Sequence, residues 1–278
     1  MTDAQQTLPV AHPLRPPRRR AEPGIAAAGP AWPSFTGTAD VVGTSNSGVT
    51  VYVDPSLGDP ALQNARDLLA AADRVVQQNN AIFGINGGPV DAIVFALGGQ
   101  TDGTGGADHD GCDFTTGKEI EVDAAFGNSQ RVIALFEAEL SENAMNGRLC
   151  GLSTGEALSR WCSMVVGANA LADFATAPQW AQDGMANWVD QTAQTDQDAD
   201  STGCGMAFLS WIMSQGHKLD EVAQAMVALG DSGTLAQLYE KLTGDPATNA
   251  WTKFQAAVQA RPGGVTTDDP FGALPSAA

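Results

Sequence analysis

No stretch of this chain reaches the length of about eighteen consecutive apolar residues that a membrane span requires, so the sequence predicts a soluble protein. Residues 1–20 also lack the apolar core of a secretory signal, so we expect no export by the usual route. The arginines at 18–20 resemble part of a twin-arginine signal, but the stretch behind them is short and interrupted by proline. We therefore expect a cytoplasmic protein or one exported by a non-classical route.

Basic residues are scarce. The chain has 14 Lys and Arg against 32 Asp and Glu, which gives a formal net charge of −18. Four of the basic residues come before residue 21, so the rest of the chain is more acidic still (Arg15, Arg18, Arg19 and Arg20). Such a charge repels phosphate backbones and argues against nucleic-acid binding. It promotes solubility, and it is also compatible with the attraction of cations or basic peptides.

Several motifs of reactive sites are missing. No cysteine belongs to a CxxC pair, which excludes a zinc ribbon or a thioredoxin motif. Two disulfides in any of three pairings, or buried thiols in a reducing compartment, remain open for the four cysteines (Cys112, Cys150, Cys162 and Cys204). The chain contains no G-x-S-x-G motif and no glycine-rich nucleotide fingerprint in the right context. A catalytic thiol at Cys112 or Cys150 would need a histidine nearby.

The two ends differ in composition from the middle. Residues 1–40 are rich in Pro, Ala, Gly and Arg without periodicity, which predicts a disordered leader whose partner the sequence does not identify. From residue 261 onward, Pro-Gly-Gly and Asp-Asp-Pro predict a flexible tail. Residues 41–260 are expected to form a single domain in which order begins near Val49, and the chain contains no internal repeat.

Hydrophobic periodicity predicts strands first and helices later. The predicted strands span residues 49–53, 90–97 and 118–124, with a helix at 62–83 and a Gly/Asp-rich loop at 98–111. The further predicted helices span residues 130–145, 154–168, 179–192, 203–216, 219–229, 234–243 and 249–260. This order indicates an α+β fold, with a small N-terminal β-sheet and one crossover helix followed by a mainly helical C-terminal half.

The most informative segment is residues 136–142, on the helix that follows the last predicted strand. Residues three apart share a helix face, so Glu139 and Glu142 can point to one place. Two carboxylates that are buried together need a cation, a proton or an arginine to compensate their charge. Solvation is the alternative for Glu142, because it stands near the predicted end of the helix.

A third candidate carboxylate is Glu156, on the next helix. Ser153 and Glu156 have the spacing of a capping box, in which hydroxyl and carboxylate satisfy free amides at a helix start. Glu156 can also pair with Arg160 one turn further on. In the functional alternative, Glu156 faces Glu139 and Glu142 across two antiparallel helices.

The order of these elements resembles the gluzincin branch of the zinc metallopeptidases, over roughly residues 49–260. The segment PQWAQDGMANW at residues 178–188 is similar to a helix of the pattern P-x-W-x-x-E-G-x-A-x-Y, which supplies a third zinc ligand in those proteins. The segments FLSWIMSQGHKLDEVAQAM and TLAQLYEKLTG are similar to the helices that follow it. The resemblance implies a zincin-like fold.

The metal-binding motif of that family is altered in this chain. Ala138-Glu139-Leu140-Ser141-Glu142 takes the place of HExxH, so Glu139 matches the general base while Ala138 and Glu142 replace the two histidines. Asp183 stands where the family has its third ligand, a glutamate. Alanine offers no ligand, catalytic zinc usually requires imidazole, and none of His12, His109 and His217 has HExxH spacing. A conventional zinc peptidase is therefore not expected.

Other chemistries remain compatible with these residues. The oxygens of Glu139, Glu142, Glu156 and Asp183 would suit a hard cation such as Ca²⁺, Mg²⁺ or Mn²⁺. His109 lies in an aspartate-rich loop that does not match an EF-hand; it would be a ligand or acid–base group if it reached the helix motif, and is otherwise solvated. A metal-free alternative uses Glu139 and Glu142 as acid and base, as glycosidases do.

The sequence therefore predicts a metallopeptidase-like protein in which a glutamate cluster, Glu139, Glu142 and Glu156, replaces the zinc site. It would be a hydrolase with altered chemistry or metal, acting on a peptide or a small molecule. The alternative is an inactive pseudoenzyme that binds a basic partner or a cation. A purely structural alternative pairs Glu139 with Arg148 or Arg160 inside the helical half.

Overall fold

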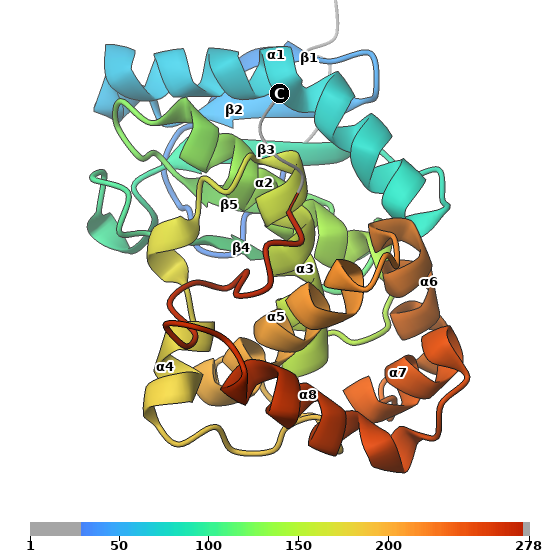
Figure 1. Ribbon diagram of the computed structural model, residues 1–278. Helices are drawn as coiled ribbons and strands as arrows, with labels where there is room; N and C mark the ends of the chain where they lie inside the picture. The colour runs from blue at the N-terminus through green and yellow to red at the C-terminus, as the bar shows by residue number, and fades with distance from the viewer. Residues whose placement is uncertain (1–28, 275–278) are drawn as a thin grey trace, which may run out of the picture.

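The computed structural model describes residues 29–274 and shows a mixed α+β fold (Figure 1). The N-terminal half forms a five-stranded sheet, and eight α-helices lie among the described residues. The α+β class predicted from the sequence is thus confirmed. None of the helices in residues 29–274 is long and apolar enough to cross a membrane.

The sheet has three parallel central strands and an antiparallel strand at each edge. Its order is β1-β2-β3-β5-β4, in which β2, β3 and β5 run parallel and β1 and β4 run against their neighbours. The strands are β1 (Asp40–Thr44), β2 (Val49–Val53), β3 (Val90–Phe95), β4 (Ala107–His109) and β5 (Glu119–Asp123). Alternate residues of the central strands, such as Val51, Val94 and Val122, enter the main core. The short edge strand β4 carries His109.

Helix α1 (Asp59–Phe83) makes the crossover from β2 to β3 and lies along the sheet (Figure 1). It follows Gly58, has a proline in its first turn, and ends at Gly84 in the left-handed conformation with φ 66°. Its buried stripe, which includes Ala61, Ala65 and Leu68, packs against β2 and β3.

Helices α2 (Ser129–Ala144) and α3 (Ser153–Val166) pack against each other, and α2 also lies against α1 and strands β4 and β5. The side chain of Asn128 caps α2 by accepting a hydrogen bond from the backbone of Arg131. Phe136 and Leu140 bury one face of α2 in the core, and this fixes the direction in which the other face points. The remaining α-helices are α4 (Ala177–Gln182), α5 (Ala199–Ser214), α6 (Leu219–Leu229), α7 (Leu235–Thr243) and α8 (Ala250–Gln259). Short 3₁₀ turns occur at Pro55–Leu57, Leu97–Gly99, Ala172–Phe174 and Ala247–Asn249.

The C-terminal helices enclose a second, aromatic part of the core. Phe254 on α8 stacks on Trp180 at 5.8 Å between ring centroids and meets Phe208 edge-on at 5.2 Å. Trp211 on α5 stacks on Tyr239 of α7 at 5.5 Å. Trp161 and Trp180 are also fully buried, so they belong to the core rather than to a binding surface.

Three predicted features of the elements are wrong. Order does not begin near Val49, because Asp40–Thr44 pairs with β2 as an edge strand, and Ala107–His109 forms a strand inside the predicted Gly/Asp loop. Strand β4 has only three residues, which is too few to show a period, and the edge strand β1 has no fully buried positions that would mark it in the sequence. The helix predicted at 179–192 ends at Gln182, because Gly184 and Met185 adopt positive φ values of 100° and 56°. Residues 183–198 then run without helix or strand to α5.

The described parts of the predicted leader and tail make specific contacts. The backbone amides of Ser34 and Phe35 donate to the buried carboxylate of Glu121 at 2.9 and 2.7 Å. Residues 1–28 of the predicted leader lie outside the described residues. In the predicted tail, the buried Asp268 accepts hydrogen bonds from the first amides of α4, at Thr176 and Ala177.

The cysteines divide into one disulfide and two thiols, a mixture the sequence did not single out. Cys112 and Cys150 form a disulfide across 38 positions of the chain. Cys162 and Cys204 are free and buried, and burial raises the pKa of the Cys204 thiol to about 12. Neither thiol is a reactive nucleophile in these surroundings, because the thiolate is the nucleophilic form.

Candidate metal centre

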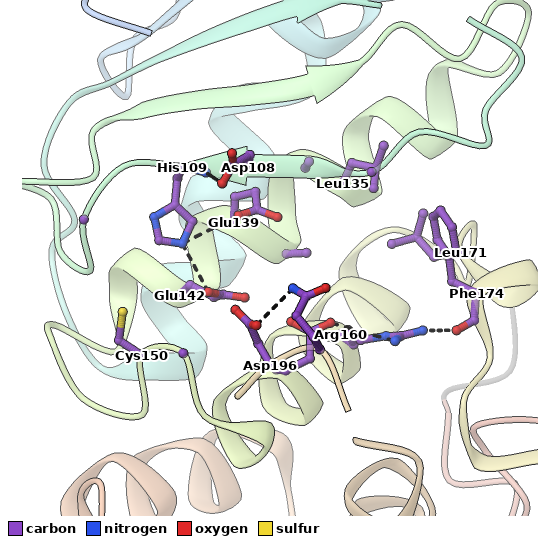
Figure 2. Close-up of a pocket in the computed structure, with 17 residues that line it drawn as sticks. Asp108, His109, Leu135, Glu139, Glu142, Cys150, Arg160, Leu171, Phe174 and Asp196 are labelled. Atoms are coloured by element: carbon purple, nitrogen blue, oxygen red, sulfur yellow. Dashed lines mark hydrogen bonds and ion pairs between the residues drawn. The ribbon is translucent and has the colours of Figure 1, made fainter. Parts of the chain in front are cut away.

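A cavity of about 500 Å³ lies between strand β4, the C-terminal half of α2 and the start of α3 (Figure 2). One side of it is lined by acidic side chains and His109, whereas the opposite side carries Leu135, Leu171 and Phe174 (Figure 2). The charged lining residues are Asp108, His109, Glu139, Glu142, Glu156, Arg160 and Asp196. Five carboxylates therefore meet one imidazole and one guanidinium in a single cavity.

Helix α2 presents Glu139 and Glu142 to this cavity, as their spacing predicts. Both side chains are largely shielded, with exposed fractions of 14% and 17%. Glu137, on the opposite face of α2, is fully buried instead and accepts a hydrogen bond from Ser141 at 3.2 Å. The buried apolar face of α2, with Phe136 and Leu140, sets the rotation of the helix, and this rotation decides which glutamates face the cavity.

His109 reaches the two glutamates from strand β4. Its register places it opposite Ile120, whose side chain enters the core on the helix-bearing face of the sheet, so the imidazole points toward α2. The Nε2 atom of His109 lies 3.1 Å from Glu142 Oε2 and 3.6 Å from Glu139 Oε2 (Figure 2). One ligand atom from each of these three residues falls within 4.8 Å of the others, so the three can hold a single ion.

Backbone close to His109 fixes the position of the ring. A side chain at Gly117 would place its Cβ 3.0 Å from His109 Nδ1, so only glycine leaves room for the imidazole there. The Cys112–Cys150 disulfide joins the segment after His109 to the connection between α2 and α3. The amide of Gly147 adds a second link by donating to the carbonyl of Cys112 at 2.7 Å.

The carboxylates lie in an environment that disfavours their charge. Burial raises the pKa of Glu139 well above its ordinary value, and the neighbouring charges of Glu142 and Glu156 raise it further. Burial and the charge of Glu142 raise the pKa of Glu156 to about 8, although Arg160 opposes this effect. Protonation of these carboxylates or a bound cation would each relieve this cost.

The surroundings of His109 favour its charged form, in contrast to the carboxylates. Burial by itself lowers the pKa of this imidazole, but the hydrogen bond and the negative charge of Glu142 outweigh burial, and the pKa is raised. Asp108 adds to the effect of Glu142. An imidazolium at this place compensates one carboxylate, and Arg160 lies 3.8 Å from Glu156, so the two cations together do not balance the five carboxylates of the cavity.

Glu156 enters the site from α3, but not through the predicted capping box. The helix begins at Ser153 with Leu152 as its cap residue, and the Ser153 hydroxyl accepts a hydrogen bond from the amide of Ala193 at 2.9 Å instead. The predicted pair of Glu156 with Arg160 is present at 3.8 Å. With no capping role to fill, the Glu156 carboxylate faces the cavity.

Arg160 is committed to structural partners. It lies 3.8 Å from Asp268 and donates to the carbonyl of Phe174 (Figure 2). Within residues 29–274, neither Arg160 nor Arg148 forms an ion pair with Glu139, so the structural alternative predicted for Glu139 is wrong.

Asp183 is not part of the site, and this prediction is wrong. Its carboxylate is exposed at the end of α4, where it accepts a hydrogen bond from Gln179, and it does not line the cavity. The early end of α4 removes the helical geometry on which the expectation depended. Asp196 occupies the cavity wall instead and raises the pKa of both Glu139 and Glu156. It lies in an irregular segment, where no periodicity in the sequence could have identified it.

Comparisons with family models, with curated proteins and with solved structures found no match to this chain. What the site can bind is therefore inferred from its own side chains. One imidazole and two carboxylates form a donor set that suits a divalent cation, and three protein ligands leave positions open for water or substrate. The set is richer in oxygen than a conventional zinc site, which favours cations that accept oxygen ligands, such as Mn²⁺.

Proposed function

We propose that this protein is a zincin-like metallohydrolase in which His109, Glu139 and Glu142 hold one divalent cation. The observation that carries the proposal is the convergence of these three ligands within 4.8 Å of one another, from a strand and a helix. The fold supports it, because the helix with the altered motif directly follows the sheet and packs against strands β4 and β5.

The site fits a cation and does not fit conventional zinc ligation. Ala138 provides no donor, so the histidine that the motif would place there has no equivalent on α2. His109 supplies an imidazole from another element, and Glu139 and Glu142 supply two carboxylates whose charges a bound cation would compensate. A bound divalent cation would polarise a substrate carbonyl or lower the pKa of a bound water molecule.

Glu156 has the properties of the acid–base group in this proposal. Its pKa of about 8 means that the carboxyl group holds a proton near neutral pH in the empty site. Arg160, 3.8 Å away, stabilises the ionised form after the proton has been given up. Glu156 is then able to donate a proton to a leaving group and to recover it afterwards.

The proposed substrate is a peptide or a small molecule with an apolar group next to the bond that is broken. The acidic side of the cavity would bind the cation, and the apolar side with Leu135, Leu171 and Phe174 would hold the apolar group. The strongly acidic chain disfavours phosphate-rich substrates.

Metal analysis of protein purified without chelator tests the proposal. We expect one equivalent of a divalent metal in the unaltered protein and its loss in Glu139→Gln and Glu142→Gln. Asp183→Asn is the matched control, because this exposed carboxylate lies outside the cavity and should leave the metal in place. Metal content that is absent, or that is equal in all four proteins, would refute the metal site.

The alternative is a pseudoenzyme that binds a partner without catalysis. The hydrogen bond between His109 and Glu142 favours it, because this pair partly satisfies the site without any metal. In that case Glu139→Gln and Glu142→Gln should leave metal content near zero and weaken the binding of a basic peptide instead. Metal content together with peptide titration therefore separates the two functions.

A further inference from the structure

A buried serine on the neighbouring helix contacts Glu142 from behind the proposed ligands. Ser159 lies on α3 with no exposed surface, and its hydroxyl donates to Glu142 Oε1 at 3.1 Å. The same hydroxyl lies 3.0 Å from the backbone carbonyl of Glu156, one turn earlier on α3. Ser159 therefore contacts two residues of the cluster without lining the cavity itself.

The two oxygens of Glu142 have different partners. Oε1 accepts the hydrogen bond from Ser159, whereas Oε2 lies 3.1 Å from His109 Nε2. A carboxylate that is held at one oxygen cannot rotate freely about its terminal torsion, whose energy profile is otherwise broad. The hydroxyl of Ser159 thus keeps Oε2 directed at the ligand atoms of His109 and Glu139.

We infer that Ser159 is a positioning residue for the metal centre, which fixes Glu142 as a ligand through Oε2 alone. This inference rests on the proposed metal site. Hydrogen bonds from outside the ligand set orient metal ligands in this way, and their loss typically lowers metal affinity about 10- to 100-fold. Without the Ser159 hydroxyl, Glu142 Oε1 would lose its hydrogen-bond donor in a site that offers few others.

The position of Ser159 in the helix supports a role beyond structure. Serine is a weaker helix former than alanine, and a serine inside a helix commonly satisfies its hydroxyl on a nearby carbonyl of the same helix. The single proton of the Ser159 hydroxyl has two acceptors within reach, the carbonyl of Glu156 on the same helix and Oε1 of Glu142 on α2. A purely helical role would not require the second contact.

Ser163 provides a matched control one turn further along α3. It is equally buried and also links α3 to α2, because its hydroxyl donates to the carbonyl of Ala134 at 2.6 Å. Its acceptor is backbone rather than a carboxylate of the site. Loss of the Ser163 hydroxyl should therefore affect the stability of the helix pair without affecting the metal.

Titration with Co²⁺, followed by its visible absorption, tests the inference on the full chain. We expect Ser159→Ala to bind Co²⁺ about 10- to 100-fold more weakly than the unaltered protein and to change the shape of the Co²⁺ spectrum. Ser163→Ala should lower the melting temperature to a similar degree but keep the affinity and the spectrum. If Ser159→Ala does not fold, Ser159→Cys takes its place, because cysteine is a weak donor of similar size.

The outcomes separate the inference from the proposed function. If the unaltered protein binds no Co²⁺, the metal site itself is refuted. If it binds Co²⁺ and the Ser159 variant binds equally well with the same spectrum, the positioning role is overturned while the metal site stands. Equal losses of affinity in the Ser159 and Ser163 variants would also overturn it, because the effect would then belong to helix packing.

Discussion

The Nε2 atom of His109 lies 3.1 Å from the carboxylate of Glu142, although 33 positions separate the two residues in the chain. This contact joins the edge strand β4 to helix α2. It brings an imidazole from a strand to the two carboxylates that α2 presents to the cavity. The two residues are therefore the link between the fold and the chemistry proposed for the cavity.

Removal of this imidazole should weaken the metal site specifically. We expect His109→Ala to lower Mn²⁺ affinity by at least about 100-fold, because a ligand is lost rather than one of the groups that orient ligands. Isothermal titration with Mn²⁺ measures the change. His217→Ala is the control, since His217 lies 4.0 Å from Glu221 on α6 and does not line the cavity. A similar loss in both variants would show that histidine at 109 has no special role.

The stability of the metal-free protein should fall as the pH rises from about 5 to 8. Glu156 has its pKa raised from 4.5 to about 8 by folding, so between these values the folded state binds more protons than the unfolded state. Stability then decreases with increasing pH in this window, and Glu139 contributes in the same direction. Melting temperatures between pH 5 and 9 in the presence of chelator measure the effect.

Two changes should reduce this pH dependence. Glu156→Gln removes the titrating group, and saturating Mn²⁺ replaces the protons with a cation. Both should give a flatter profile of melting temperature against pH. A profile that rises from pH 5 to 8 in the metal-free protein would contradict the arrangement of buried carboxylates.

Loss of the disulfide should affect both stability and metal binding. Cys112 and Cys150 enclose 38 positions of the chain that include Glu139 and Glu142, and loss of such a link typically costs about 2–5 kcal/mol in the free energy of unfolding. We expect the Cys112→Ala/Cys150→Ala double variant to melt at lower temperature and to bind Mn²⁺ more weakly, because the segment after His109 is no longer held. Dithiothreitol should reproduce the effect in the unaltered protein and add nothing to the double variant.

Asp196 should influence the site where Asp183 does not. Asp196 lines the cavity and acts on Glu139 and Glu156 through its charge, so Asp196→Asn should weaken Mn²⁺ binding by up to about 5-fold. Asp183→Asn should leave the affinity unchanged, since that carboxylate is exposed on α4. If Asp183→Asn weakened Mn²⁺ binding and Asp196→Asn did not, Asp183 would belong to the site, as the sequence predicted.

Residues with a strong periodic pattern were predictable from the sequence. The long stripe that includes Ala65 and Leu68 gave helix α1, and the spacing of Glu139 and Glu142 placed both carboxylates on one face of α2. These properties depend on local geometry, which sequence separation describes directly. The functional alternative for Glu156, in which it faces the other two glutamates, also agrees with its place in the cavity wall.

Residues that depend on tertiary context were not predictable. His109 was only a conditional candidate, because its direction depends on the pairing of a three-residue edge strand with β5. The predicted capping box at Ser153 is absent because the Ser153 hydroxyl accepts a hydrogen bond from the amide of Ala193, 40 positions away. Asp183 lies outside the cavity because Gly184 and Met185 adopt positive φ values and end α4. Asp196, in the irregular segment that follows, lines the cavity instead. Local sequence patterns contain none of these contacts.

Pulsed electron paramagnetic resonance of the Mn²⁺-loaded protein with ¹⁵N-labelled histidine measures directly whether His109 is a metal ligand. We expect a ¹⁵N coupling from a single imidazole, which His217→Ala preserves and His109→Ala abolishes. We also expect that Glu139→Gln/Glu142→Gln prevents Mn²⁺ from binding at this site. A Mn²⁺ spectrum without a histidine coupling, or a coupling that persists in His109→Ala, would contradict the proposed ligand set.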